Sequence, residues 1–393
     1  MSWEKATLGD IADIFSGYAF KSADMNSERG TPLIKIKNIA DSRVSHQCDA
    51  FLNKDFDLSK YERFHLLCDD FLVAMTGQGS VGRIGKMRSY RPGYYVNQRV
   101  AIARVNPQKA NPVFVYYQIA TKSNELELFK KANGAGQPNI SAKQIGELSV
   151  LLPPIAAQQY IADILSAYDI LIENNQKQIK LLEEAAQRLY KEWFVDLRFP
   201  GYENTPIVDG VPEGWKKERL VDVVKVQYGY AFDGSLFNAN GNGTPIVRIR
   251  NIPSGTTGDY TTETAESQYI VHNGDLLVGM DGEFHINSWS GSDAYLVQRT
   301  CSFRPHNDKM KGYLLQAIYE PIKYFESTVV GATVAHLGKK HIDTITVLTC
   351  PDTLYVPFQQ HFERRQLLLN QNQLLAEARD RLLPKLINGE IEV

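Results

Sequence analysis

Residues 31–39 read Thr-Pro-Leu-Ile-Lys-Ile-Lys-Asn-Ile, and residues 244–252 read Thr-Pro-Ile-Val-Arg-Ile-Arg-Asn-Ile. The two stretches keep the same order of β-branched and basic side chains although they lie 213 residues apart. Agreement over a run of this length indicates an internal repeat whose period is about half the chain. Each copy of the repeat is therefore expected to form a structural unit of its own.

The repeat extends to both sides of this stretch. The matching segments, in chain order, are Trp3, Leu8 and Asp10 with Trp215, Leu220 and Asp222, Gly-Tyr-Ala-Phe at 17–20 with 229–232, Asp-Phe-Leu-Val-Ala-Met at 70–75 with Asp-Leu-Leu-Val-Gly-Met at 275–280, Gln98-Arg99 with Gln298-Arg299, Gly134-Ala135 with Gly331-Ala332, and 181–185 with 374–378. Their order never changes, although the offset shrinks where the loops differ in length. The chain is therefore predicted to be two copies of one module, each a globular part followed by a helix.

The globular parts show mixed α and β patterns. Short runs that are β-branched or alternating, and that are bounded by Gly, Pro or Asn, predict strands. Such runs occupy 31–39, 70–76, 94–104, 244–252 and 274–280, whereas 112–132 is predicted to be a helix. The predicted fold class of each globular part is therefore mixed α/β.

Each globular part is followed by a tract of helical periodicity. Two rows at steps of seven, typical of a coiled-coil seam, are Ile161, Tyr168, Asn175, Leu182 and Leu189, and Leu165, Ile172, Ile179, Ala186 and Trp193. The second tract, 358–383, carries Leu368, Leu375 and Leu382 within a wider apolar stripe. Asn175 has the character of a register-setting polar residue. An ordinary amphipathic core helix is the alternative interpretation.

Proline residues mark the predicted ends of both helices. Pro153-Pro154 precedes the first helix, Phe199-Pro200-Gly201 follows it, and Pro384 closes the second. The predicted parts are a globular domain at 1–152, a central helix at 153–199, a second globular domain at 200–350 and a C-terminal helix at 351–393.

If the helices pack as an antiparallel coiled coil, the repeat becomes a pseudo-twofold. A helix of about 36 residues spans about 54 Å, enough to hold two DNA-reading domains one helical turn of about 34–36 Å apart.

Composition restricts the protein class. The chain has 393 residues, of which 43% are hydrophobic and 22% charged, and its net charge is -2, so DNA binding requires a local patch. Its four cysteines form no Cys-x-x-Cys pair, and no stretch approaches the ~18 apolar residues of a membrane span. The N-terminus lacks the apolar run of a signal peptide. We expect a cytoplasmic protein with reduced thiols and no membrane association.

One segment of the first copy is locally basic. Residues 71–124 contain no Asp or Glu, and Tyr90, Tyr94 and Tyr95 lie among the cations. The cations are Arg83, Lys86, Arg88, Arg91, Arg99, Arg104, Lys109 and Lys122. This combination predicts a nucleic-acid-binding face, with a solvated surface as the alternative. The corresponding segment of the second copy, 276–325, balances its acids and bases, so the two copies are not expected to bind DNA equally well.

Paired cations on predicted strands are the first candidates for DNA contact. Lys35 and Lys37 alternate along one predicted strand, as Arg248 and Arg250 do along another, so each pair is expected to point to one face and to grip a phosphate strand. A solvated strand face explains the same pattern.

The matched and the divergent segments predict different roles. Arg99 and Arg299, each after a Gln, are shared by both copies and fall in predicted apolar strands, which favours phosphate positioning or a buried structural bond over base reading. Base reading is expected where the copies diverge, in loops 76–91 and 280–292. The candidates there are Gln78, Ser80 and Arg83 in the first copy and Asp281, Glu283 and His285 in the second. Lys86 and Arg88, in the first of these loops, are further candidates for DNA contact.

Catalytic and metal-binding motifs are not expected to operate in this chain. Residues 77–82 fit Gly-x-Gly-x-x-Gly, but no helix is predicted to follow them and the second copy lacks the motif. No Asn/Asp-Pro-Pro-aromatic motif and no His-Glu-x-x-His occurs, and the eight histidines are isolated. We therefore predict no catalytic residues, no metal site and no nucleotide site.

Three stretches carry a family resemblance. They are Leu-Pro-Pro-Ile at 152–155 with the Gln-Gln pair at 158–159, Lys-Glu-Trp-Phe-Val-Asp-Leu-Arg-Phe-Pro-Gly at 191–201, and Pro-Glu-Gly-Trp at 212–215. Together they resemble the specificity (S) subunits of type I restriction-modification systems, and the resemblance covers essentially the whole chain. Gly134-Ala135 followed by Ile140-Ser141 matches a further element of the family, from which 331–338 of the second copy departs.

The resemblance implies a subunit that is not itself an enzyme. It would read a bipartite double-stranded DNA sequence, one half-site per target-recognition domain, and dock two modification (methyltransferase) subunits through its helices. In the full complex, S-adenosylmethionine, ATP and magnesium would belong to the modification and restriction subunits, with no cofactor in this chain. The competing classes are a methyltransferase or nuclease that performs the chemistry itself, and a purely structural coiled-coil scaffold.

Overall fold

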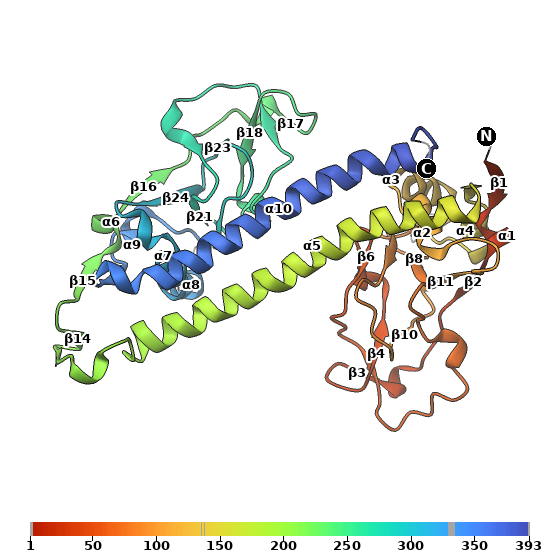
Figure 1. Ribbon diagram of the computed structural model, residues 1–393, viewed down its shortest axis with the longest axis horizontal. Helices are drawn as coiled ribbons and strands as arrows, with labels where there is room; N and C mark the ends of the chain where they lie inside the picture. Colours follow the sequence, from red (N-terminus) through yellow and green to blue (C-terminus); the bar gives the residue numbers. More distant parts are fainter. Residues whose placement is uncertain (1–2, 135, 137, 329–334, 392–393) are drawn as a thin grey trace. The chain divides into compact units, whose positions relative to one another are not determined.

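The computed structural model describes residues 3–134, 136, 138–328 and 335–391. The chain divides into two compact units: unit 1 is Met1–Ile170 with Ala376–Val393, and unit 2 is Leu171–Leu375. Each unit contains one globular part, called here head 1 (3–152) or head 2 (200–350), and portions of the two long helices, α5 (Ile155–Tyr190) and α10 (Val356–Ile387) (Figure 1).

Head 1 is built on a six-stranded sheet in the order β2-β11-β8-β9-β6-β5. The strands are β2 (Ala12–Ser16), β11 (Val100–Val105), β8 (Phe71–Ala74), β9 (Ile84–Lys86), β6 (Arg43–Val44) and β5 (Ile39–Ala40). All residues of β8 are buried, as its unbroken apolar sequence requires. The pairs are antiparallel except β6 with β9.

The described part of head 1 also contains a smaller sheet and short helices. The sheet order is β10-β4-β7-β3, from β10 (Tyr95–Val96), β4 (Thr31–Ile34), β7 (Phe51–Leu52) and β3 (Met25–Asn26). The helices are α1 (Leu8–Ile11), α2 (Pro112–Ile119), α3 (Lys122–Lys131) and α4 (Ala142–Gly146). Strand β1 (Glu4–Thr7) pairs with β12 (Ser149–Leu152), so the start and end of head 1 lie together.

Head 2 repeats this order. One sheet has the order β16-β24-β21-β22, from β16 (Val224–Tyr228), β24 (Thr300–Pro305), β21 (Leu276–Gly279) and β22 (Ile286–Ser288). The other has the order β17-β19-β18-β23-β20, from β17 (Phe237–Asn238), β19 (Tyr260–Thr261), β18 (Thr244–Val247), β23 (Ala294–Leu296) and β20 (Ile270–Val271). The helices are α6 (Leu220–Val223), α7 (Lys311–Ala317), α8 (Tyr319–Thr328) and α9 (Lys339–Ile342), and β15 (Lys216–Arg219) pairs with β25 (Thr346–Thr349). The predicted duplication and the mixed α/β class are confirmed.

The long helices run antiparallel within each unit, as predicted. In unit 1, Asp169 of α5 bonds to Arg379 of α10, and Ile161 shares a core with Leu386. In unit 2, Glu183 of α5 bonds to Arg365 of α10. Of the predicted seam, Ile161, Leu165, Ile172, Asn175, Ile179, Ala186 and Leu368 are buried, and Tyr168, Leu182, Leu189, Trp193, Leu375 and Leu382 are half-buried.

The strands predicted at 31–39 and 244–252 are too long. Strand β4 ends at Ile34, and a 3-10 turn follows at 36–38 because the Asn38 Oδ1 accepts the Lys35 N–H at 2.8 Å. The Asn251 Oδ1 accepts the Arg248 N–H in the same way at 2.8 Å. Lys35 and Lys37, like Arg248 and Arg250, therefore do not alternate along one strand, and this prediction is wrong.

Three further boundaries differ from expectation. The predicted strand at 94–104 is two strands, β10 and β11, joined by a turn at Gln98-Arg99. The helix predicted at 112–132 is α2 and α3, because the Thr121 side chain caps α3 at the Asn124 N–H. Helix α10 continues past Pro384, since the proline removes only one internal hydrogen bond while the next turn buries Leu386 in the core of unit 1.

Over the residues that the structure describes, no helix combines the length and the apolar character needed to cross a membrane. Ala135 and residues 331–334, which belong to the predicted Gly-Ala element of the two copies, lie outside the described residues.

Candidate nucleic-acid interface

A two-residue turn presents the Gln98-Arg99 pair at the surface of head 1. The Gln98 N–H donates to the Tyr18 carbonyl at 3.0 Å, and the Tyr18 N–H donates to the Val96 carbonyl at 2.9 Å. A Cβ added to Gly17 would stand 2.2 Å from the Val96 oxygen. Only glycine permits this approach of the backbones, which explains the glycine before Tyr18 in the segment that pairs with the turn.

Head 2 builds the same turn from the repeated residues. The Gln298 N–H donates to the Tyr230 carbonyl at 2.7 Å, and a Cβ added to Gly229 would stand 2.1 Å from the Val297 oxygen. Arg299 takes the left-handed region, with φ of 70°, a conformation that costs free energy in a residue with a side chain. Arg99 and Arg299 are both exposed in turns, so their predicted placement in apolar strands is wrong, and so is the alternative of a buried structural bond. Phosphate positioning by these two arginines stays a prediction.

Backbone hydrogen bonds join each turn to two other segments. In head 1, the Met75 N–H donates to the Arg99 carbonyl at 2.9 Å and the Ile140 N–H donates to the Met75 carbonyl at 2.9 Å. In head 2, Met280 and Arg299 form the first of these bonds at 2.9 Å, and Leu337 and Met280 form the second at 2.7 Å. The turn therefore meets the loop after the central strand and the segment before the last short helix in both heads.

The residues one position beyond these hydrogen bonds also pair across the two segments, as isolated antiparallel bridges. The bridges are Thr76 with Asn139 in head 1 and Asp281 with His336 in head 2. We call Thr76, Arg99 and Asn139 the Arg99 cluster, and Asp281, Arg299 and His336 the Arg299 cluster. The structure brings the predicted residues Asp281 and Arg299 together. Asn139 and His336 were missed, because their proximity to the turn depends on a segment about 40 residues further along the chain.

The Arg299 cluster is held by charge. The Asp281 Oδ1 lies 2.5 Å from the His336 Nδ1, and the Asp281 Oδ2 lies 3.3 Å from the Arg299 Nε. The side chains of Arg299 and His336 are 56% and 46% exposed. The carboxylate thus orients a guanidinium and an imidazole that both remain accessible to a ligand.

The Arg99 cluster has no carboxylate among its three members. Asn139 is exposed, whereas the Thr76 Oγ1 is buried and has no hydrogen-bond partner within the described residues. The loop that leaves Thr76 turns through Gly77, whose φ is 106° and whose N–H donates to the Pro138 carbonyl at 3.1 Å. Gln78 and Arg83 of this loop are exposed, and Ser80 is half-buried.

A glutamate on the adjacent helix anchors each of the divergent loops. The Glu125 Oε1 accepts the Ile84 N–H at 3.1 Å in head 1, and the Glu326 Oε2 accepts the Phe284 N–H at 2.7 Å in head 2. Burial acts to raise the pKa of Glu326, but Lys323 and the Phe284 N–H stabilise its carboxylate and hold that pKa below its ordinary value. The sequence signal is Lys-x-x-Glu at 122–125 and 323–326.

The basic segment 71–124 does not form one free face. Lys86 pairs with Asp69 at 2.9 Å, Arg88 with Asp169 at 2.8 Å, Arg104 with Asp70 at 2.7 Å, and Lys122 with Glu125 at 2.8 Å. Acids from outside the segment neutralise these cations: those at 69, 70 and 125 border the segment in the sequence, and folding brings Asp169 to it from α5. Lys86 and Arg88 are therefore placed in ion pairs of the fold, whereas Arg83, Arg91 and Arg99 are exposed.

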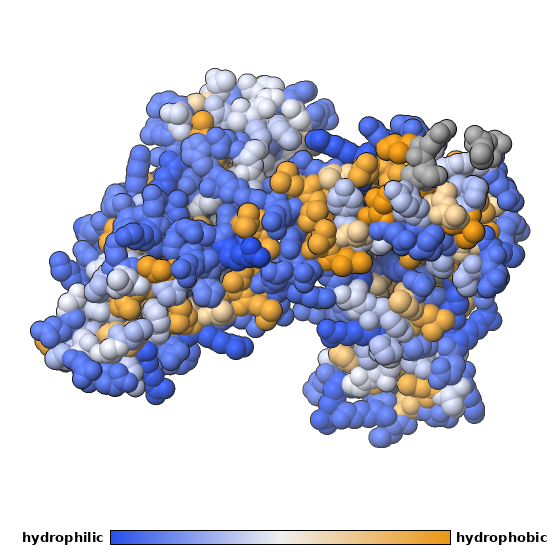
Figure 2. Space-filling view, in the orientation of Figure 1, coloured by the Kyte–Doolittle hydropathy of each residue, from blue (hydrophilic) through white to orange (hydrophobic). Residues whose placement is uncertain are grey.

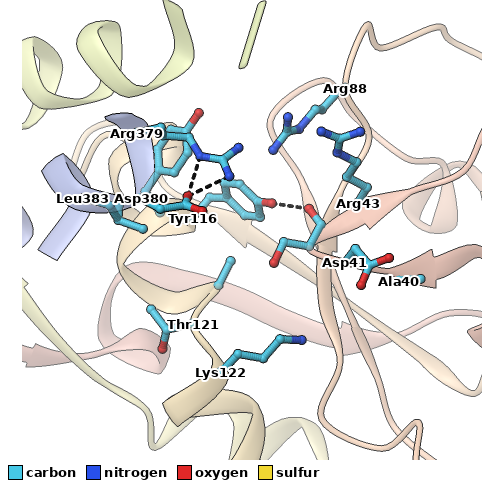
Figure 3. A pocket seen from close by; sticks show the side chains of 13 residues that line it. Ala40, Asp41, Arg43, Arg88, Tyr116, Thr121, Lys122, Arg379, Asp380 and Leu383 are labelled. Carbon is cyan, nitrogen blue, oxygen red and sulfur yellow. Dashed lines mark hydrogen bonds and ion pairs between the residues drawn. The ribbon is translucent and has the colours of Figure 1, made fainter. Parts of the chain in front are cut away.

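Arg88 lines a cavity of about 590 Å³ in unit 1, shown in Figure 3. Arg43, Tyr116 and Arg379 line the same cavity. Burial, followed by the neighbouring Arg88 guanidinium, lowers the pKa of Arg43, and burial raises the pKa of Tyr116 to about 12. A second cavity, of about 480 Å³, lies beside the divergent loop of head 1 and is lined in part by Gly79, Arg83 and Phe129.

The remaining predicted side chains make local contacts. Lys35 is half-buried, Lys37 forms an ion pair with Asp49, and Arg250 pairs with Asp259 at 2.5 Å. The Arg248 guanidinium lies 5.5 Å from the centre of the Phe237 ring. His285 lies 3.5 Å from Glu283.

The comparisons with known proteins agree with one another. The model of the type I restriction modification DNA specificity domain matches residues 1–184 and 212–353. The MjaIX specificity subunit of Methanocaldococcus jannaschii is 27% identical over 307 residues, which cover 71% of this chain and 69% of that protein. The HindI specificity subunit of Haemophilus influenzae is 22% identical over 466 residues, with 99% of each chain covered.

A crystal structure of a type I restriction-modification system S subunit from M. genitalium has the same fold, with a TM-score of 0.59 and 17% identity over 98% of this chain and 96% of that one. The family model covers well over half of the present chain and matches it twice, once in each copy of the repeat. The chain therefore belongs to the family of specificity subunits of type I restriction-modification systems.

Proposed function

We propose that this specificity subunit reads a bipartite double-stranded DNA target, with one half-site per head. The observation that carries the proposal is the pair of clusters, in which the same exposed Gln-Arg turn lies beside different neighbours in the two heads. A shared arginine suits the phosphate backbone, which is alike at every site, whereas differing neighbours suit different base sequences. Because DNA is the substrate, we infer a cytoplasmic location.

We propose that α5 and α10 bind two modification subunits and set the gap between the half-sites. In unit 2, large apolar side chains remain exposed on both helices: Leu171 and Leu181 on α5 and Leu367 and Leu374 on α10 are 46–66% exposed. Figure 2 shows apolar surface over this part of the helices. Exposed apolar surface on a helix pair that already buries its seam favours contact with another protein.

We further propose that the chain performs no chemistry, and that S-adenosylmethionine, ATP and magnesium are used by the modification and restriction subunits. The purified chain, supplied with all three, is expected neither to methylate nor to cut DNA, and added modification subunits are expected to produce methylation. Turnover by the isolated chain would show that it is an enzyme.

A domain exchange tests the assignment of one half-site to each head. Residues 1–152 are replaced by the corresponding domain of another specificity subunit, and the methylated sites are mapped in cells that also carry the modification subunits. We expect one half-site to change and the other to stay. A change in both half-sites would contradict independent reading by the two heads.

A further inference from the structure

The two clusters place different side chains at equivalent positions. The same pair of backbone hydrogen bonds connects Met75 and Met280 to the turn and to the segment before the last short helix of each head. One residue beyond these bonds, Thr76 faces Asn139 in head 1 and Asp281 faces His336 in head 2. Thr76 is therefore equivalent to Asp281, and Asn139 is equivalent to His336.

The equivalent residues differ in the hydrogen bonds that they offer. The exposed amide of Asn139 carries both a donor and an acceptor, which match the N6 and N7 edge of adenine in the major groove. His336 contacts both Asp281, at 2.5 Å, and the Arg299 Nη1, at 3.4 Å, through Nδ1, so Nε2 is the ring nitrogen that remains for a ligand. A single ring nitrogen makes one hydrogen bond, so His336 cannot make the bidentate contact with a base edge that the Asn139 amide can make.

An exposed arginine lies beside each of these pairs. The Arg299 Nε is directed to Asp281 at 3.3 Å, and the guanidinium as a whole is 56% exposed. Arg99 occupies the equivalent exposed turn in head 1. An arginine that is identical in both heads contributes affinity through phosphate contacts but does not distinguish one half-site from the other.

We propose that Asn139 and His336, the latter held by Asp281, are the residues that determine one base position in each half-site, with Arg99 and Arg299 bound to the adjacent phosphates. This inference rests on the proposed reading of a bipartite target. It assigns base reading to a segment that precedes the last short helix of each head, rather than to Glu283 or His285 of the divergent loop in head 2.

The decisive variant transfers the head 1 pair into head 2. Asp281→Thr with His336→Asn is expressed together with the modification subunits, and the methylated sites are mapped across the genome. We expect the preferred base at one position of the head 2 half-site to change, with the head 1 half-site and the gap unchanged. A pair that only supports the turn would lower methylation at every site without changing any preferred base, and that result would overturn the proposal.

A second His–carboxylate pair in head 2 provides the matched control. The His272 Nδ1 lies 2.8 Å from the Asp293 Oδ1, and both side chains are at least 60% exposed. The neighbouring Asn273 bonds to Asn370 of α10, so this pair lies on the part of head 2 that contacts the helix. His272→Asn with Asp293→Thr should leave the recognised sequence unchanged, and a changed base preference in this control would also overturn the proposal.

Two further measurements separate the possible failures. If the wild-type complex methylates a site that is not bipartite, the proposed function itself fails; if its site is bipartite but the transferred pair changes no base, only this inference fails. Should the double variant not methylate DNA, the single variant His336→Gln, which keeps a polar side chain, is mapped instead. An unchanged preferred base in that variant would overturn the proposal, and a changed one would support it.

Discussion

Asp169 and Arg379 form an ion pair between the two long helices of unit 1, with 2.5 Å between Oδ1 and Nη1. The same carboxylate lies 2.8 Å from the Arg88 guanidinium of head 1 and accepts the Tyr117 hydroxyl at 2.6 Å. Its side chain is only 9% exposed. One buried carboxylate therefore joins head 1 to both α5 and α10.

Removal of this charge should destabilise unit 1. Asp169→Asn keeps the size of the side chain but leaves the Arg88 and Arg379 guanidinium groups, 17% and 18% exposed, without their shared counter-ion. Loss of one partner of a buried pair costs about 3–5 kcal/mol, and the partial exposure here reduces the expected loss to roughly 2–4 kcal/mol. Urea unfolding of the purified chain measures it. Asp163→Asn, at an exposed position of the same helix, should change the free energy of unfolding by less than about 0.5 kcal/mol.

Substitution of the repeated glycines should disturb the Gln-Arg turns. Gly17→Ala and Gly229→Ala place a methyl group 2.2 Å and 2.1 Å from a backbone oxygen, so the paired strands must separate. We expect each substitution to lower the free energy of unfolding by about 1–3 kcal/mol, which is measured as a lower Tm. Gly258→Ala is the control, because nothing lies within 4 Å of its added Cβ. Equal effects of all three substitutions would contradict the close-approach explanation.

Arg83 is expected to contact DNA through a phosphate or a base. Arg83→Ala should weaken DNA binding, and if the contact is to a phosphate, the slope of log K against log salt should fall by about one unit. A relaxed preference at one base position would instead indicate base reading. Lys86→Ala serves as comparison, since Lys86 is paired with Asp69 and should have the smaller effect. Unchanged affinity of Arg83→Ala for cognate and random DNA would remove this residue from the interface.

The stabilising effect of Glu326 should depend on pH. The folded-state pKa of Glu326 lies below its ordinary value, so its contribution to stability is present above about pH 4.3, the usual unfolded pKa, and disappears as pH falls through the lower folded value. Glu326→Gln should therefore lose less stability than wild type between pH 7 and pH 3, as measured by urea unfolding. Glu320→Gln, at an exposed position of the same helix, should follow the wild-type profile.

Lengthening the first long helix should lengthen the gap between the half-sites. Four residues inserted after the exposed Lys180 add about 6 Å of helix, and only part of this reaches the heads because α10 is unchanged. We expect both half-sites to stay the same and the gap to grow by about one or two base pairs, each about 3.4 Å. Mapping of methylated sites checks this expectation. Four residues inserted after Gly241, in a loop of head 2 with open space around it, should leave the gap unchanged.

Local patterns predicted the duplication, the mixed α/β heads and the antiparallel helices. Periodicity and β-branched runs depend only on which residues are neighbours in the chain, and both copies repeat them. Strand and helix ends were less predictable. The strand at 31–39 ended early because the Asn38 side chain captured a backbone N–H, and α10 passed Pro384 because packing of Leu386 outweighed one lost hydrogen bond.

Some residues of the candidate interface could be identified from the sequence, whereas others came together only on folding. The sequence alone identified Arg99, Arg299 and Asp281 as candidates, since repetition and divergence between the copies can be read from the residues themselves. Folding alone brought His336 to within 2.5 Å of Asp281 and brought Asp169 to Arg88. Charge along the chain did not predict charge at the surface, because electrostatic interaction depends on distance in space and not on separation in sequence.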